Sequence, residues 1–236
     1  MSLYFLLYYF ISIVKLGTEP TTSSFMDFLP HKISAYAEAH TTSDTPLLQA
    51  LDRETHLQTL KPRMLSGHLQ GRFLSMISQM LKPKAVLEIG TFTGYSALCL
   101  AEGLVEGGVL HTIEADEELE PIIRKYFEAS GLAGKLRLHI GNALEIIPTL
   151  EETFDMVFID AAKREYPAYY DLVIDRVRSG GFIIADNILW SGKVTEETKD
   201  VDTKIIDGFN KKIHEDSRVE NILLPIRDGL IVARKY

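Results

Sequence analysis

Side chains with oxygen ligands follow two apolar stretches of the chain. The run FDMVFI at 154–159 ends in Asp160, and the run FIIA at 182–185 ends in Asp186 and Asn187. Apolar runs of this length are typical of strands buried in a parallel sheet. Because neighbouring parallel strands end at the same edge of a sheet, we expect the three side chains to converge there. Two carboxylates and an amide suit Mg²⁺, Ca²⁺ or Mn²⁺; the alternative is that the aspartates only cap the helices that follow.

A lysine lies close to the first of these carboxylates. Lys163 follows Asp160 in the segment IDAAKREYPAYY, at the start of the next expected helix. Most lysines in such positions are solvated, but a lysine beside a bound cation can act as a general base for an acceptor hydroxyl. Trp190, in ILWSGKV after the second run, either borders an aromatic acceptor or packs into the core.

A glycine-containing turn precedes these residues in the chain. Gly90 and Gly94 lie in VLEIGTFTGYSAL, between an expected strand and its helix, and Glu114 ends the following strand LHTIEAD. Glycines allow the backbone to approach a ligand, and an acid at the end of the second strand commonly holds a ribose diol. The spacing is not G-x-G-x-x-G, so the dinucleotide fingerprint is not met. The combination predicts a nucleoside-type ligand at this edge of the sheet.

Strand and helix patterns alternate along the chain and position these residues. Strands are predicted at 84–90, 108–116, 135–141, 154–160 and 182–187, and helices at 94–104, 117–131, 142–150 and 166–181, the last ending at Gly180 and Gly181. Earlier helices are predicted at 45–60, after the N-cap candidates Ser43 and Asp44, and at 66–81. Such alternation predicts right-handed βαβ units on a parallel sheet, and thus an α/β fold.

The C-terminal part departs from the alternation. After a helix near 203–214, the strand-like runs VENILLPIR and GLIVARKY are separated by Asp228 and Gly229. Asp-Gly between two such runs is a strong hairpin signal, so an antiparallel hairpin is expected to close the sheet. We find no repeat and no linker, and we predict one domain over 26–236.

The N-terminal segment 1–25 has a different composition. It is apolar from residue 3 to residue 14, which is shorter than the roughly 20 residues of a membrane-spanning helix. Three interpretations compete: a helix that touches a membrane or a partner, a degenerate signal, and an upstream extension that the fold does not need. We favour the last, because a domain start with its own methionine follows at Met26. We therefore expect no firm membrane association.

The overall charge and the cysteine content exclude other classes. The formal net charge is −8, which argues against nucleic acid as a partner. The single cysteine, Cys99, excludes an intrachain disulfide and a thiolate zinc cluster. A small-molecule ligand remains the expected partner.

Several long motifs occur together in the order of one known family. LEIGTFTGYSAL, IDAAKREYPAYY, GGFIIADNILWSGKV and the final PIRDGLIVARK resemble the cation-dependent, S-adenosylmethionine-dependent O-methyltransferases of the caffeoyl-CoA and catechol type. The resemblance runs from Met64 to the C-terminus. It implies a Rossmann-like class I methyltransferase fold, with a mostly parallel seven-stranded sheet flanked by helices and ending in an antiparallel hairpin. It also implies methyl transfer from S-adenosyl-L-methionine to a hydroxyl of a catechol-like or caffeoyl-type phenol, usually with magnesium.

The same resemblance implies roles for individual residues. Asp160, Asp186 and Asn187 would bind the cation, Asp160 would also touch the acceptor, and Lys163 would be the catalytic base. Glu114 would hold the ribose hydroxyls of the cofactor. The remaining cofactor contacts would come from the glycine turn, the preceding segment and the residue beside the adenine: Ser66, Glu88, Gly90, Thr91, Ser96 and Ala143. Relatives are often homodimers, so we expect a homodimer, and a cytoplasmic location.

Two residues depart from the family pattern, and other functions are compatible with parts of the sequence. Ala162 stands where plant relatives often carry an aspartate, and Asn142 stands where an acid is frequent. An NAD-dependent dehydrogenase or a non-catalytic nucleotide-binding protein would share the fold, although the glycine spacing and the Asp-Asn strand end argue against the dehydrogenase. A nucleic-acid methyltransferase usually carries an Asn/Asp-Pro-Pro-aromatic motif where this chain has IDAAK.

Overall fold

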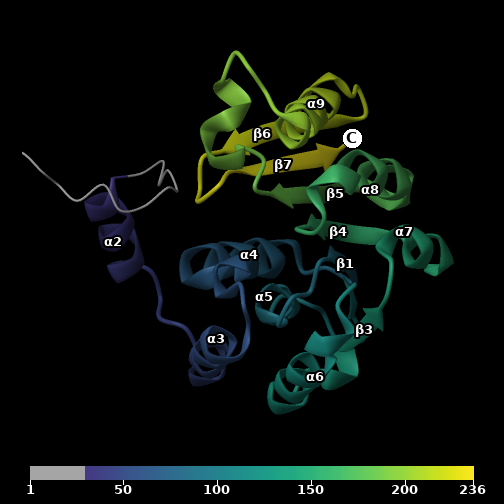
Figure 1. Cartoon of the computed structure of the whole chain (residues 1–236). Coiled ribbons are helices and arrows are strands. Elements are labelled where there is room, and N and C mark those ends of the chain that lie inside the picture. The colour runs from purple at the N-terminus through teal and green to yellow at the C-terminus, as the bar shows by residue number, and fades with distance from the viewer. Residues whose placement is uncertain (1–29) are drawn as a thin grey trace, which may run out of the picture.

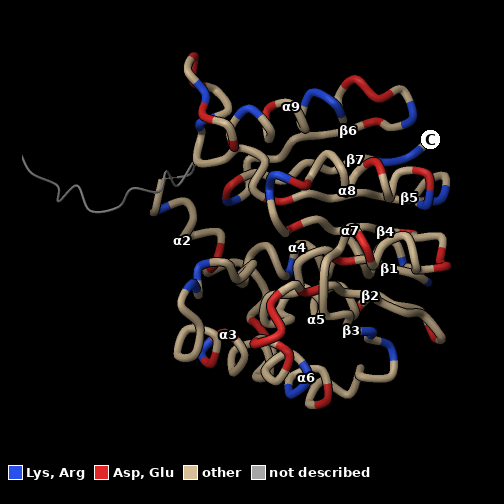
Figure 2. The backbone as a smooth tube through the Cα atoms, turned by 45° about the vertical axis from the view of Figure 1, so that its right-hand side comes forward, with Lys and Arg blue, Asp and Glu red and all other residues tan. Residues whose placement is uncertain are grey.

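The computed structural model describes residues 30–236, and a seven-stranded sheet forms the centre of this part of the chain. The strand order is β3-β2-β1-β4-β5-β7-β6. The strands labelled in Figure 1 follow this order from bottom to top, and Figure 2 also labels β2, between β3 and β1. All pairs are parallel except β5–β7 and β7–β6. The strands are β1 (Ala85–Ile89), β2 (Val109–Glu114), β3 (Leu136–Ile140), β4 (Phe154–Ile159), β5 (Val177–Asp186), β6 (Val219–Leu224) and β7 (Leu230–Lys235). The predicted parallel sheet with a closing hairpin is confirmed.

Helices cover both faces of this sheet, and each face has its own hydrophobic cluster. One cluster joins the strands to α3 (Pro46–Gln58), α4 (Gly67–Leu81), α5 (Tyr95–Ala101) and α6 (Glu120–Ala129). The other joins them to α7 (Ala143–Ile146), α8 (Tyr166–Val173) and α9 (Val201–Glu215). Adjacent strand residues such as Val86 and Leu87 point into opposite clusters, as the period of a strand requires. Figure 1 shows the first described helix, α2 (His31–Ala39), away from the sheet, and none of its residues is buried.

The register of the central strands aligns their carboxyl ends. Ile89 on β1 lies opposite Ile159 on β4, and Ile159 lies opposite Ala185 on β5. The next residues on β4 and β5 are Asp160 and Asp186, so the predicted neighbouring strand ends are confirmed. The strand order reverses between β1 and β4. Ligands of such sheets bind at this switch point, beyond the carboxyl ends of the strands, where both aspartates lie.

The helix predicted over 166–181 is too long. Helix α8 ends at Val173, a short 3₁₀ turn covers Ile174–Arg176, and β5 already begins at Val177. Gly180 has a φ of 74°, and a side chain on Gly181 would lie 2.9 Å from the carbonyl oxygen of Asp155 on β4. The paired glycines therefore allow an irregular start of β5 close to β4 instead of ending a helix.

Two further boundaries differ from the prediction. The N-cap of α3 is Thr45, whose side chain accepts a hydrogen bond from the Leu48 N–H, whereas Asp44 accepts one from the Tyr95 hydroxyl at 2.5 Å. The final hairpin has the five-residue loop 225–229 between the paired residues Leu224 and Leu230, not a two-residue Asp-Gly turn. Arg227 and Gly229 both have positive φ in this loop.

The prediction that 1–25 is a dispensable extension lies outside the described residues. Between residues 30 and 236, no helix is long and apolar enough to cross a membrane. Figure 2 shows acidic and basic residues interspersed along this part of the chain, without a basic stretch that covers one element.

Candidate active site

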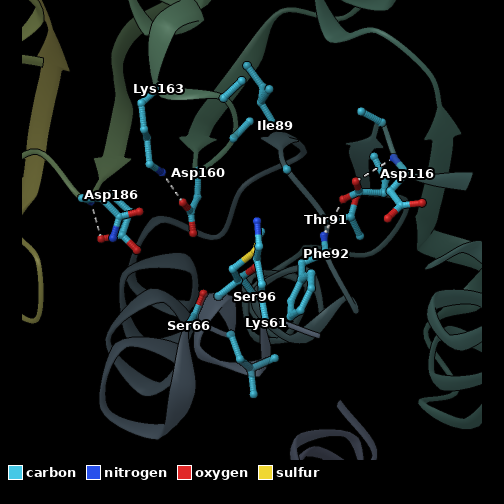
Figure 3. A pocket seen from close by; sticks show the side chains of 18 of the residues that line it. Lys61, Ser66, Ile89, Thr91, Phe92, Ser96, Asp116, Asp160, Lys163 and Asp186 are labelled. Carbon is cyan, nitrogen blue, oxygen red and sulfur yellow. Dashed lines mark hydrogen bonds and ion pairs between the residues drawn. The ribbon is translucent and has the colours of Figure 1, made fainter. Parts of the chain in front are cut away.

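A cavity of about 1500 Å³ opens where the central strands end, and it brings together most of the predicted site residues. The expected cation ligands and the expected base line it together, and so do most of the expected cofactor contacts. These lining residues are Asp160, Lys163, Asp186, Asn187, Ser66, Gly90, Thr91, Ser96, Glu114 and Ala143. Figure 3 shows Asp160, Lys163 and Asp186 along one side and Thr91 and Phe92 along the other. The two halves predicted separately from the sequence therefore form one site.

Asp186 is a carboxylate held almost entirely inside the protein. Its side chain accepts the backbone N–H of Asn187 at 2.6 Å and the Gln70 side-chain amide at 2.8 Å. The residue is 2% exposed. Burial, followed by the nearby charge of Asp160, raises the pKa of Asp186 to about 6. A cation between these groups would favour the charged carboxylate and offset its repulsion from Asp160.

Lys163 is oriented by two neighbours at the rim of the cavity. Its Nζ donates to Asp160 Oδ1 at 2.7 Å and to the Tyr166 hydroxyl at 2.6 Å. The Tyr166 hydroxyl in turn donates to the backbone carbonyl of Asp186 at 3.1 Å. Tyr166 is fully buried, and burial raises its pKa well above the ordinary range, so the phenol stays neutral. It therefore connects the lysine to the end of β5.

The donor set is compatible with a hard divalent cation. Within residues 30–236, no group of three or more His, Cys, Asp or Glu side chains is arranged to hold a metal ion. The candidate ligands are instead two carboxylates and the Asn187 amide, which line the same cavity. Neither aspartate caps the helical turn that follows it: the turns Lys163–Glu165 and Trp190–Thr195 have Ala162 and Leu189 at the N-cap, without a side-chain cap. The alternative of simple helix caps is thus not observed.

The glycine turn after β1 has close neighbours that explain its composition. Gly90 has a φ of 99°, and a Cβ atom there would lie 2.0 Å from the backbone carbonyl oxygen of Asp160. Gly94, at the N-cap of α5, has a φ of 94°. The missing side chain at Gly90 therefore allows the ends of β1 and β4 to approach, which brings the turn next to Asp160.

Glu114 presents a preorganised carboxylate at the opposite side of the cavity. It accepts the backbone N–H groups of Phe92 at 2.7 Å and of Asp116 at 2.9 Å. Burial nevertheless raises the pKa of Glu114. A carboxylate fixed by two backbone donors, with the remaining acceptor capacity directed to a cavity, fits a diol such as that of a ribose.

Glu88 is the one expected cofactor contact that does not line the cavity. It is fully buried in β1, accepts the Thr112 hydroxyl at 2.5 Å and also interacts with Ser96. Burial raises the pKa of Glu88 to about 8, so it holds its proton near neutral pH. Its Oε1 atom has no hydrogen-bond partner within the described chain. Glu88 therefore supports the cavity wall through Ser96.

The two departures from the family pattern, Asn142 and Ala162, lie in the same cavity, and Asn142 also caps a helix. Asn142 is the N-cap of α7 and accepts the Leu144 N–H at 2.9 Å. Ala162 and Asn142 both line the cavity. Trp190 lines the cavity and packs against one of the two core clusters, and its contact with an aromatic acceptor stays a prediction.

Three residues of the site were missed from the sequence: Tyr166, Gln70 and Arg227. Tyr166 contacts Lys163 three positions earlier, a local spacing that could have indicated it. Gln70 and Arg227 contact the site from α4 and from the hairpin loop, and no local pattern points to either.

Comparisons with known proteins agree with this geometry. A family model described as O-methyltransferase matches residues 37–236. The chain is 32% identical over 225 residues to a probable caffeoyl-CoA O-methyltransferase of Dictyostelium discoideum, covering 92% of this chain and 97% of that one. It is 37% identical over 132 residues to a catechol O-methyltransferase of Niastella koreensis, covering 54% and 60%. An SAH-bound methyltransferase structure from Podospora anserina superimposes with a TM-score of 0.81 at 27% identity, covering 94% and 100%.

Proposed function

Because the chain belongs to the O-methyltransferase family, we propose that it transfers a methyl group from S-adenosylmethionine to one hydroxyl of a vicinal diphenol of the catechol or caffeoyl type. We further propose that a divalent cation, most simply Mg²⁺, takes part. The observation that carries this proposal is that a carboxylate pair, an amide and a lysine share one cavity with Glu114, a carboxylate held by two backbone N–H groups.

The cofactor half of the proposal assigns S-adenosylmethionine to the Glu114 side. When bound, this group supplies an electrophilic methyl on a sulfonium. Glu114 would accept hydrogen bonds from the ribose hydroxyls, and the turn containing Gly90 and Thr91, which lines the same cavity, would hold another part of the cofactor. The SAH-bound relative supports a cofactor of this class, and the two backbone N–H groups that hold Glu114 support its position.

The cation half assigns Asp160, Asp186 and Asn187 as ligands. A divalent cation held there would supply a Lewis acid that lowers the pKa of an acceptor hydroxyl. The protein contributes the orientation of Asp186, which is held by the Asn187 N–H and Gln70. The buried Asp186 carboxylate lies near the like charge of the partly exposed Asp160, and this arrangement supports a site that requires positive charge.

Lys163 is proposed to receive the proton of the acceptor hydroxyl at Nζ. The hydrogen bonds to Asp160 and Tyr166 hold this atom at the rim of the cavity. Holding the acceptor oxygen and the methyl donor in reacting alignment is worth about 7–11 kcal/mol in favourable cases.

The test is methyl transfer to catechols, caffeoyl derivatives and hydroxylated flavonoids, with Mg²⁺ and with excess EDTA. We expect turnover with Mg²⁺ and its loss in EDTA, and we expect Asp186→Ala to lose turnover while it retains S-adenosylhomocysteine binding. Full activity in EDTA would contradict the proposed role of the cation. Binding of NAD without S-adenosylmethionine binding would favour a dehydrogenase, and cofactor binding without turnover of any diphenol would favour a non-catalytic protein.

The homodimer and the cytoplasmic location stay predictions, which light scattering and cell fractionation would test.

A further inference from the structure

Gln70 is a buried polar residue that lies behind the cavity rather than in its lining. It belongs to α4 and is 0% exposed. Its Nε2 donates to Asp186 Oδ2 at 2.8 Å, while the Asn187 N–H occupies Asp186 Oδ1. Both oxygens of this carboxylate are therefore held by donors of the protein, one from α4 and one from the backbone of the next residue.

Arg227 determines which end of the Gln70 amide faces Asp186. Its Nη1 atom lies 3.5 Å from Gln70 Oε1 and also donates to the backbone carbonyl of Ser66 at the start of α4. A guanidinium only donates hydrogen bonds and a carboxylate only accepts them. A single orientation of the amide satisfies both neighbours, with the carbonyl toward Arg227 and the NH₂ group toward Asp186.

The loop that carries Arg227 is itself tied to the segment after Asn187. The Ser191 N–H donates to Asp228 Oδ1 at 2.6 Å, and the Leu189 N–H donates to the Asp228 carbonyl at 2.9 Å. A side chain on Gly229 would lie 2.5 Å from Leu189 Cγ. The hairpin loop, the end of β5 and the start of α4 are thus joined through one set of contacts.

We propose that Gln70 is a positioning residue, locked by Arg227, that orients the Asp186 carboxylate for a divalent cation. This inference rests on the proposed function, because it requires that Asp186 is a cation ligand. A carboxylate that is free to rotate binds a cation less tightly, because binding must then also fix the orientation of the carboxylate. Loss of a residue that orients a metal ligand typically lowers metal affinity about 10- to 100-fold.

A purely structural role for Gln70 makes a different prediction. If the amide only satisfied a buried hydrogen bond, its replacement would change stability and not cation affinity. Arg227 also carries a positive charge close to Asp186. If that charge were its only influence, removal of Arg227 would tighten cation binding, because repulsion would fall. Removal of Arg227 should therefore weaken cation binding if Arg227 acts by holding Gln70, and tighten it if Arg227 acts only through its charge.

The experiment is a Mn²⁺ titration of the full chain in which electron paramagnetic resonance measures the free Mn²⁺. The affinity for S-adenosylhomocysteine is measured on the same samples. For Gln70→Met we expect Mn²⁺ affinity to fall about 10- to 100-fold, with S-adenosylhomocysteine affinity unchanged. For Arg227→Met we expect weaker Mn²⁺ binding when Gln70 is present, and no weakening in the Gln70→Met background, because Arg227 acts through Gln70.

Matched controls lie on α4, which carries Gln70, and on β7, which follows the loop that carries Arg227. Gln79→Met changes an exposed glutamine of α4 that contacts Ser75, and Arg234→Met changes an arginine of β7 that pairs with Glu220. Both should bind Mn²⁺ as the parent protein does. Unchanged affinity in Gln70→Met, or tighter binding in Arg227→Met in both backgrounds, would overturn the inference. If Gln70→Met does not fold, the sign of the Arg227→Met effect decides. If the parent protein binds no Mn²⁺, the cation part of the proposed function fails as well.

Discussion

Carboxyl groups in the cavity and behind its wall have raised pKa values, because burial disfavours their charged forms. Asp186 is a buried carboxylate whose pKa is raised to about 6, and Glu88 is buried deeply enough to keep its proton. Carboxyl groups with perturbed pKa values that lie close to one cavity are typical of functional sites. Lys163 is the residue of this group whose proposed role can be tested most directly.

Replacement of Lys163 by methionine should lower kcat about 100- to 10,000-fold, since this is the usual contribution of a positioned general base. The affinity for S-adenosylhomocysteine should not change, because Lys163 lies on the cation side of the cavity. Steady-state kinetics and calorimetry measure the two quantities.

A suitable control for this variant is Lys212→Met. Lys212 Nζ lies 2.6 Å from Asp171 Oδ2 and 6.0 Å from the centre of the Tyr170 ring, so it resembles Lys163 in having a carboxylate and a tyrosine as partners. It does not line the cavity. An unchanged kcat in Lys163→Met, as in the control, would remove this lysine as the base.

At the scale of elements, the site depends on close approach between strand ends. Gly90 allows the turn after β1 to lie against Asp160 at the end of β4. Gly90→Ala should therefore destabilise the protein by about 3 kcal/mol or more, because a close contact is added to an unfavourable positive φ. Thermal denaturation or urea titration measures the free energy of unfolding.

Gly107→Ala separates the two causes. Gly107 has a φ of 70° but nothing within 4 Å of an added Cβ atom. Its cost should be only the strain of about 1–2 kcal/mol. Equal losses in both variants would show that the contact with Asp160 is unimportant.

The pair β2 and β3 carries a pH-dependent contact away from the site. His111 Nδ1 lies 2.9 Å from His139 Nε2, and burial, followed by the charge of His111, lowers the pKa of His139. The folded chain then binds fewer protons than the unfolded chain, so stability is present above about pH 6.5 and is lost as the pH falls through the lowered value.

The measurement for this contact is the free energy of unfolding between about pH 7 and pH 5. His139→Gln should make the decrease in stability with falling pH smaller. His214→Gln, which changes an exposed histidine of α9, should leave it as in the parent protein. A decrease that is equally steep in His139→Gln would contradict the assignment.

At the scale of the whole molecule, the family match and the described domain both lie after the apolar N-terminal segment. The match begins at residue 37. We therefore expect a chain that begins at Met26 to keep the melting temperature and the kcat of the full chain. Calorimetry and the methyl-transfer assay would test this, and loss of folding or activity would contradict it.

A longer truncation provides the contrast. A chain that begins at Thr45 lacks Asp44, which accepts the Tyr95 hydroxyl at 2.5 Å and lies 3.6 Å from Arg72. Because Tyr95 is buried, we expect this chain to lose about 1–3 kcal/mol of stability.

The sequence by itself determined the order of strands and helices and the positions of the main chemical groups. Apolar runs that end in Asp160 and in Asp186 identify both the strands and the site, because a residue that follows a parallel strand necessarily lies at one edge of the sheet. Glu114 and the turn at Gly90 could be predicted for the same reason. This information is local, since it depends on the period of a strand and on the residue at its end.

Only the tertiary structure decided which distant side chains support those groups. Gln70 reaches Asp186 across 116 positions, and Arg227 reaches Ser66 across 161. Such contacts depend on how α4 and the hairpin loop pack against the sheet, and no local period encodes them. The start of β5 was also mispredicted, because Gly180 and Gly181 end a helix in many sequences, whereas here they let β5 begin against β4. Local periodicity thus identifies the elements, and packing between elements selects the partners of each side chain.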